Sequence, residues 1–232
     1  MDKPIVYKYK FKFVDGKEKD FELTLDSKTL NLVQQERKNL PDWTELKNFR
    51  CPNCTLDENR NRYCPIAVNI IDVVEFFRKN ISYEEVDVVV ESDARKYVKH
   101  TALQKGVSSL MGIYMTTSGC PVMEKLKPMV RYHLPFATME ETSHRIISMY
   151  LIAQYFLYKK GKNVDLKLEK LAKIYDNVKD VNQNICGKLS QLKIEDAILN
   201  ALVSLDCFAS SMSLASYEEV LEKLEYGFRI FE

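Results

Sequence analysis

The N-terminal segment alternates apolar and basic residues with the period of a β-strand. Its apolar positions are aromatic and are separated by lysines: Tyr7, Tyr9, Phe11 and Phe13. One face of this strand is therefore expected to be buried and the other solvated. Asp15-Gly16 predicts a turn. After it Phe21, Leu23 and Leu25 alternate with polar residues, so the two segments are expected to pair as an antiparallel hairpin.

A helical pattern and a second hairpin pattern follow. Between Ala67 and Phe77 the apolar residues cover most of the girth of a helix. Alternating valines from 86 to 90 predict a strand, and Ser92-Asp93 is expected to turn the chain into a partner strand over 95–99. The first hundred residues thus predict a modest antiparallel sheet with helical cover.

Beyond residue 100 the apolar residues recur at intervals of three, four and seven, which is helical spacing. Three such stripes run over residues 164–185, 194–205 and 220–228. The longest apolar run, from Ile146 to Tyr158, is shorter than the about 20 residues that cross a bilayer as a helix. It is interpreted as a buried core helix, and no membrane span is expected.

The predicted fold class is therefore α+β, with N-terminal antiparallel β-hairpins and a cysteine-rich loop followed by a mainly α-helical C-terminal region. The strand-rich region with the cysteine loop covers 1–100 and the helical region 101–232. No internal repeat, low-complexity tract or flexible Gly/Ser linker separates them. We therefore expect the two regions to share one core.

Composition excludes some function classes. The 232 residues are 46% hydrophobic and carry a formal net charge of +1, so a broad phosphate-binding surface is not expected and neither is nucleic-acid binding. The N-terminal residues contain no apolar signal core, which predicts a cytoplasmic protein. In that compartment the six cysteines are expected to be free thiols or metal ligands rather than disulfides.

Four cysteines form the most informative pattern of the chain. Cys51 and Cys54 stand three residues apart in Cys-Pro-Asn-Cys, Cys64 follows in Tyr-Cys-Pro, and Cys120 lies farther along in Ser-Gly-Cys-Pro. Two thiolates at this spacing grip one soft metal ion, and two more complete a tetrahedron. The long irregular loop around the first three also needs an organising centre. The plain alternative is that these cysteines are small buried apolar residues.

The identity of the metal and of the fourth ligand stays open at this level. Zinc is the commoner structural solution for such a knuckle, whereas proline after a ligand also occurs in ferredoxins and hints at an iron-sulfur cluster. His133 is an alternative to Cys120 as fourth ligand. Cys120 also precedes a proline that suits the start of a helix, where a thiolate is favoured. A thiol-dependent enzyme using Cys120 with His133 or His144 as base is therefore a further hypothesis.

No complete catalytic constellation accompanies these thiols, and no catalytic residue is assigned. The chain has neither a His-Glu-x-x-His motif nor a phosphate-binding loop, a Rossmann fingerprint or a Gly-x-Ser-x-Gly elbow. The leading hypothesis is a non-enzymatic regulatory or interaction protein stabilised by zinc at Cys51, Cys54, Cys64 and Cys120. Such a protein would act through a protein partner or as a homo-oligomer. Whether it binds a small molecule is unknown from the sequence.

Together the Cys-Pro-Asn-Cys, Tyr-Cys-Pro and Ser-Gly-Cys-Pro motifs and the segment Arg131-Tyr-His-Leu-Pro-Phe136 resemble a family of uncharacterised bacterial proteins. The resemblance spans nearly the whole chain. It implies a cytoplasmic bacterial origin and one integrated fold. It implies no catalytic activity and assigns no role to any residue.

Overall fold

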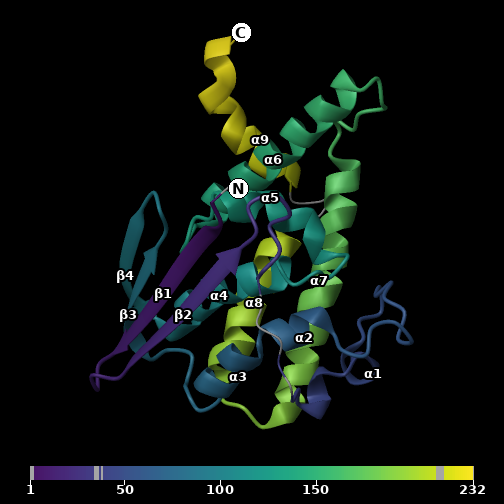
Figure 1. The fold of residues 1–232 in the computed structure, drawn as a ribbon. Coiled ribbons are helices and arrows are strands. Elements are labelled where there is room, and N and C mark those ends of the chain that lie inside the picture. The colour runs from purple at the N-terminus through teal and green to yellow at the C-terminus, as the bar shows by residue number, and fades with distance from the viewer. Residues whose placement is uncertain (1–2, 34–36, 38, 213–216, 232) are drawn as a thin grey trace.

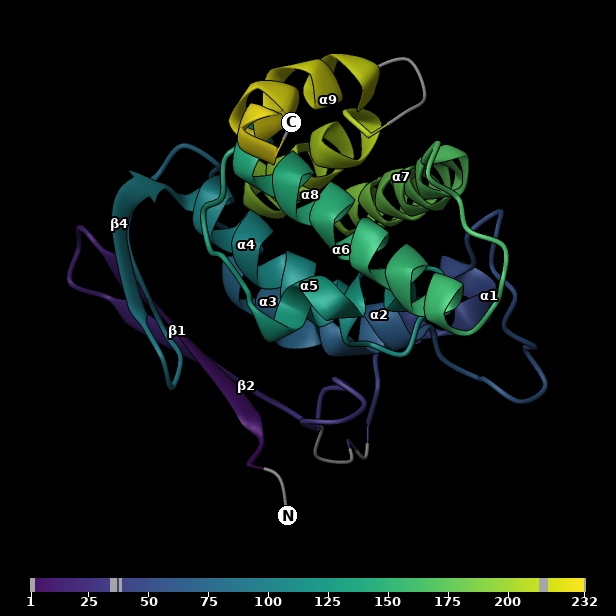
Figure 2. The ribbon, with the colours of Figure 1, turned by 90° about the horizontal axis from the view of Figure 1, so that it is seen from above.

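A computed structural model describes residues 3–33, 37, 39–212 and 217–231 of the chain. The described strands form one antiparallel sheet of four strands in the order β2-β1-β3-β4. Helices cover one face of this sheet (Figures 1 and 2). The strands are β1 (Ile5–Phe13), β2 (Glu18–Leu25), β3 (Glu85–Glu91) and β4 (Lys96–Ala102). The predicted α+β class and both predicted hairpins are confirmed.

The sheet follows the alternation of the sequence. Tyr7, Tyr9 and Phe11 are buried against the helices, and the intervening lysines lie on the other face. Lys8 stands opposite Glu22 in the β1–β2 register and forms an ion pair with it at 3.0 Å. The exposed face is therefore paired in charge, which leaves no broad basic surface there.

The first helices are short and surround the cysteine loop. They are the 3-10 helix η1 (Asp42–Thr44), α1 (Leu46–Phe49), α2 (Pro65–Asn69) and α3 (Ile71–Phe77). The single helix expected between Ala67 and Phe77 is thus wrong in detail. The chain bends at Ile70, whose φ of −92° and ψ of 2° interrupt the helix and separate α2 from α3.

The second half of the chain is helical, as the spacing predicts. Its elements are α4 (Leu103–Thr116), η2 (Met123–Leu126), α5 (Lys127–Arg131), α6 (Met139–Lys159), α7 (Glu169–Leu189), η3 (Ser190–Leu192), α8 (Asp196–Ser210), α9 (Tyr217–Glu225) and η4 (Tyr226–Phe231). The stripe that begins at residue 164 becomes helical only at Glu169, because Leu168 has a φ of +60°. One cluster of buried apolar side chains includes residues of the sheet and of the helices on both sides of residue 100.

Helix α6 corrects one prediction. It buries Ile146, Ile147 and Tyr150, but four apolar residues in its second half are more than half exposed: Ile152, Tyr155, Phe156 and Tyr158. The apolar run is therefore not a fully buried core helix, because no described element covers this side of its C-terminal half. Within the described ranges no helix combines the length and apolar character that a membrane crossing requires.

Candidate metal centre

The loop between α1 and α2 brings its first and last cysteines to the same part of the fold. The backbone N–H of Cys54 donates to the carbonyl of Cys51 at 3.1 Å, which forms a tight turn. At the other end, the N–H of Cys64 donates to the carbonyl of Thr44 at 2.8 Å, and a β-bridge joins Glu45 to Tyr63. These bonds fix the two ends of the loop next to α1.

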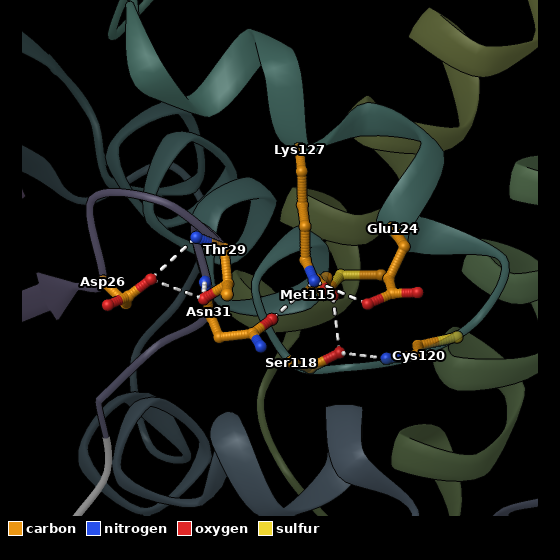
Figure 3. A network of polar contacts seen from close by, with 8 residues as sticks. All are labelled: Asp26, Thr29, Asn31, Met115, Ser118, Cys120, Glu124 and Lys127. Atoms are coloured by element: carbon orange, nitrogen blue, oxygen red, sulfur yellow. Dashed lines mark hydrogen bonds and ion pairs between the residues drawn. The ribbon is translucent and has the colours of Figure 1, made fainter.

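Cys120 lies on a turn that follows α4. Gly119 has a φ of +90°, a conformation that glycine adopts without strain. Ser118 stiffens the turn, because its hydroxyl donates to the carbonyl of Met115 at 2.7 Å and accepts the N–H of Cys120 at 3.2 Å (Figure 3). The serine, glycine and cysteine of the Ser-Gly-Cys-Pro motif are thus explained by the geometry of this turn.

A polar network ties this turn to the loop after β2 (Figure 3). The buried ammonium group of Lys127 donates to Asn31 Oδ1 at 2.5 Å and to Glu124 Oε1 at 2.6 Å. The Asn31 loop is itself held by Asp26, whose Oδ1 accepts from the N–H of Thr29 at 2.7 Å. The segment that carries Cys120 is therefore anchored to the sheet side of the molecule by a charged side chain.

Helix α7 forms the third support of the cysteine loop. Asn184 Nδ2 donates to Cys51 Sγ at 3.3 Å and to the carbonyl of Phe49 at 3.2 Å. Asn53 Nδ2 donates to the carbonyl of Asn177 at 2.9 Å. Sequence reasoning missed Asn184, because nothing in its local sequence distinguishes it from other polar residues on a helix.

The four predicted ligands line one small cavity of about 20 Å³. Cys51 and Cys64 are buried, and Cys54 and Cys120 are half-buried. The remaining wall is mostly apolar and includes Leu46, Phe49, Leu56, Ile66, Val122 and Val181. The structure thus brings together thiols from three separate segments, and it does so inside an apolar shell that limits access of water.

The thiols share this cavity without being closed around one centre. Among the described residues, no three His, Cys, Asp or Glu side chains are grouped in a way that could hold a metal ion. Four thiol sulfurs in an apolar shell are the donor set that zinc and iron prefer in structural sites. The chemistry of these residues therefore suits a tetrathiolate centre, whereas their arrangement among the described residues does not close around one ion.

Burial controls the protonation of the thiols. It raises the pKa of Cys51 to about 12 and that of Cys64 to about 11, and it also raises the pKa of Cys120. The backbone amides of Val122 and Met123 act in the opposite direction on the pKa of Cys120. The expected effect of the helical turn is therefore present, but burial outweighs it. A free nucleophilic thiolate is not favoured here at neutral pH, and a metal ion would supply the missing positive charge.

His133 lies away from the cysteines. Its Nε2 is 2.5 Å from the hydroxyl of Tyr9 and 3.4 Å from that of Ser109, and its ring packs edge-on against Tyr7. It lines a second, larger cavity, and the cysteine cavity has no histidine among its described lining residues. Of the two alternatives for the fourth ligand, the arrangement favours Cys120.

The comparisons with known proteins give a family and no activity. A family described as "Domain of unknown function (DUF6901)" matches residues 5–229. The chain therefore belongs to this family, which covers nearly its whole length. No curated protein and no solved structure matches the chain.

Proposed function

We propose that this member of the DUF6901 family is a non-enzymatic regulatory or interaction protein whose fold is stabilised by one zinc ion bound to Cys51, Cys54, Cys64 and Cys120. The observation that carries the proposal is the convergence of four thiols from three chain segments on one cavity. A bound ion would join the cysteine loop to the turn after α4. The free energy of metal binding would then contribute directly to the free energy of folding.

The size of the cavity favours a single ion over a cluster. A volume of about 20 Å³ is close to that of one water-sized probe. An iron-sulfur cluster with bridging sulfides needs more room than one ion. The iron-sulfur hypothesis is therefore the second choice, and the two differ in colour because iron–thiolate centres absorb visible light.

The interaction role is supported by the exposed apolar side of α6. Its four residues, Ile152, Tyr155, Phe156 and Tyr158, each expose more than half of their surface. Contiguous exposed apolar surface of this kind marks interaction sites in soluble proteins. A protein partner or a second copy of the chain would bury it.

The test is the metal content of untagged protein purified without oxygen, together with its absorption spectrum. We expect about one equivalent of zinc and no visible absorption. Cys51→Ser should lose the metal and lower the melting temperature by about 5 °C or more, as a loss of about 2 kcal/mol would in a chain of this size. Cys207→Ser, at an exposed cysteine outside the cavity, is the matched control and should change neither value.

Two results would contradict the zinc proposal. One is wild-type protein that is folded but contains no stoichiometric metal. The other is Cys51→Ser protein that keeps both its metal and its melting temperature. Several equivalents of iron with visible absorption would instead establish the iron-sulfur alternative and a redox or sensing role.

A further inference from the structure

The molecule contains a second cavity of about 400 Å³ between α4, α5, α6, α7 and α8. Its volume falls within the range of about 300–1,000 Å³ that is typical of small-molecule sites. Most of its wall is apolar and includes Ile113, Met123, Leu126, Val178, Leu205 and Phe208. None of the four cysteines lines it. It is therefore a site of its own, with room for an organic molecule.

The charged groups on this wall have one sign. Arg145, Lys99 and Lys105 line the cavity, and the described lining contains no aspartate or glutamate. Lys99 and Lys105 are exposed, whereas Arg145 is half-buried. The electrostatic environment of the cavity thus favours an anionic ligand over a cationic one.

Arg145 is held in place by two backbone carbonyls and, among the carboxylates of the described residues, feels only the electrostatic attraction of Glu141, one turn earlier on α6. Its Nη2 donates to the carbonyl of Met129 at 2.8 Å and to that of Tyr132 at 3.0 Å. Within the described part of the chain no carboxylate forms an ion pair with it. Burial lowers the pKa of Arg145 from its ordinary value, so desolvation disfavours its charge. A bound anion would compensate this cost.

Two further polar groups in the cavity lack strong partners. Tyr175 is 4% exposed, and among the described residues its hydroxyl forms a hydrogen bond only to the thioether of Met129, at 3.8 Å. Asn182 is 2% exposed, and its Oδ1 has no hydrogen-bond partner in the described structure. Buried polar groups without partners cost stability unless a ligand satisfies them. Asn182 lies two turns beyond Tyr175, about 10 Å along α7, and offers a second polar position.

We propose that this cavity binds a small apolar molecule with one carboxylate group, which Arg145 and the Tyr175 hydroxyl hold while the apolar wall encloses the body. One half-buried guanidinium balances one negative charge. A phosphate monoester would bring a second charge that no other buried cation in the described lining matches. The Asn182 amide is a second polar position that a ligand with a further polar atom would satisfy, and binding of a simple monocarboxylate does not require it. The proposal does not depend on a metal at the cysteines.

The test compares three ten-carbon ligands by isothermal titration of the full chain with its metal content as purified. Decanoate has the proposed charge, decan-1-ol has the same body without charge, and decylammonium has the opposite charge. We expect saturable 1:1 binding of decanoate, at least tenfold weaker binding of decan-1-ol, and no 1:1 binding of decylammonium. Equal affinity for all three, or no saturable binding of decanoate to folded protein, would overturn the proposal.

Two variants locate the binding. Arg145→Met should weaken decanoate binding at least tenfold and leave decan-1-ol binding unchanged. Ala137→Trp adds volume at a half-buried position of the wall and should weaken both ligands, whereas Ala137→Ser should weaken neither. If Arg145→Met fails to fold because it loses the bonds to Met129 and Tyr132, the Ala137 pair decides. Decanoate binding that Ala137→Trp leaves intact would place the ligand elsewhere and refute the proposal.

Discussion

At the scale of single residues, two cysteines share one local design. Cys64 and Cys120 are each followed by proline, which has no N–H, and the next two backbone amides lie near each sulfur and lower its pKa. At Cys64 these amides do not reach hydrogen-bond geometry. Because proline has no N–H, the nearest backbone donors are the amides of the second and third residues after each cysteine. These amides would support the thiolate form that metal binding requires.

His133 provides a prediction about acid stability. Burial lowers its pKa to about 3, and the nearby guanidinium of Arg145 acts in the same direction. An unfolded histidine has a pKa of about 6.5. As the pH falls below about 6.5, the unfolded chain takes up a proton that the folded chain binds only near pH 3. His133 should therefore decrease the free energy of unfolding between pH 6.5 and 3.

The check is denaturant unfolding of wild type and His133→Gln at pH 7 and pH 5. The loss of stability on acidification should be smaller in the variant. His100 supplies a control of opposite sign, because hydrogen bonds to Asp87 and Glu85 raise its pKa. Its contribution is present below about pH 6.5 and is lost as the pH rises through its folded value. His100→Gln should therefore lose more stability on acidification than wild type, and a loss in His133→Gln as large as in wild type would contradict the prediction.

At the scale of elements, the position of α4 on the sheet depends on one glycine. A Cβ at Gly106 would lie 2.8 Å from both Phe11 Cε1 and Val88 Cγ2, whereas a Cβ at Gly112 would meet only Leu205 Cδ2, at 3.7 Å. Close packing of α4 on the sheet therefore requires glycine at position 106. At Gly112 an added methyl group would make only an ordinary van der Waals contact.

These two glycines make a matched pair of substitutions. Gly106→Ala should lower the free energy of unfolding, because two contacts at 2.8 Å with buried side chains place the overpacking cost in the upper part of about 1–3 kcal/mol, above the about 1 kcal/mol gained in helix propensity. Gly112→Ala should be neutral or stabilise by up to about 1 kcal/mol. Urea unfolding of the two variants measures the difference. Equal stability of the two would show that the sheet accommodates the added methyl group.

The elements also show what the apolar pattern of the sequence can predict about burial. The alternation of β1 specifies its buried face, and the stripes of α7 and α8 specify theirs. In α6 the long apolar run predicts a buried helix, and the structure leaves Ile152 and Phe156 exposed. The apolar pattern of a segment states which residues prefer to be buried. It does not state whether another element of the chain covers them.

At the scale of the whole molecule, the two cavities share a wall. Val122 lines the cysteine cavity and Met123 lines the large cavity, and on α7 Val181 and Val178 do the same. The segment between Cys120 and α5 therefore contacts the proposed metal centre on one side and the proposed ligand site on the other. A metal that fixes Cys120 would also fix this part of the ligand site.

This shared wall predicts coupling between the two sites. Removal of the metal with a chelator should weaken decanoate binding several-fold, because the wall that includes Met123 loses its anchor at Cys120. Titration of metal-loaded and metal-depleted protein measures the effect, and circular dichroism establishes that the depleted protein remains folded. The cation of Lys127, bonded to Asn31 and Glu124, would still hold the segment in part. Identical affinities in the two states would mean that the sites are independent.

The sequence by itself determined the local features of this protein. Strand alternation, helical spacing and turn residues depend on neighbours within a few residues, so the order of residues specifies them. The tertiary structure alone decided which distant groups meet. It placed Asn184 beside Cys51, His133 away from the cysteines, and Arg145, Tyr175 and Asn182 around one cavity. These groups come from separate elements. Their proximity depends on how the helices pack, which cannot be read from their positions along the chain.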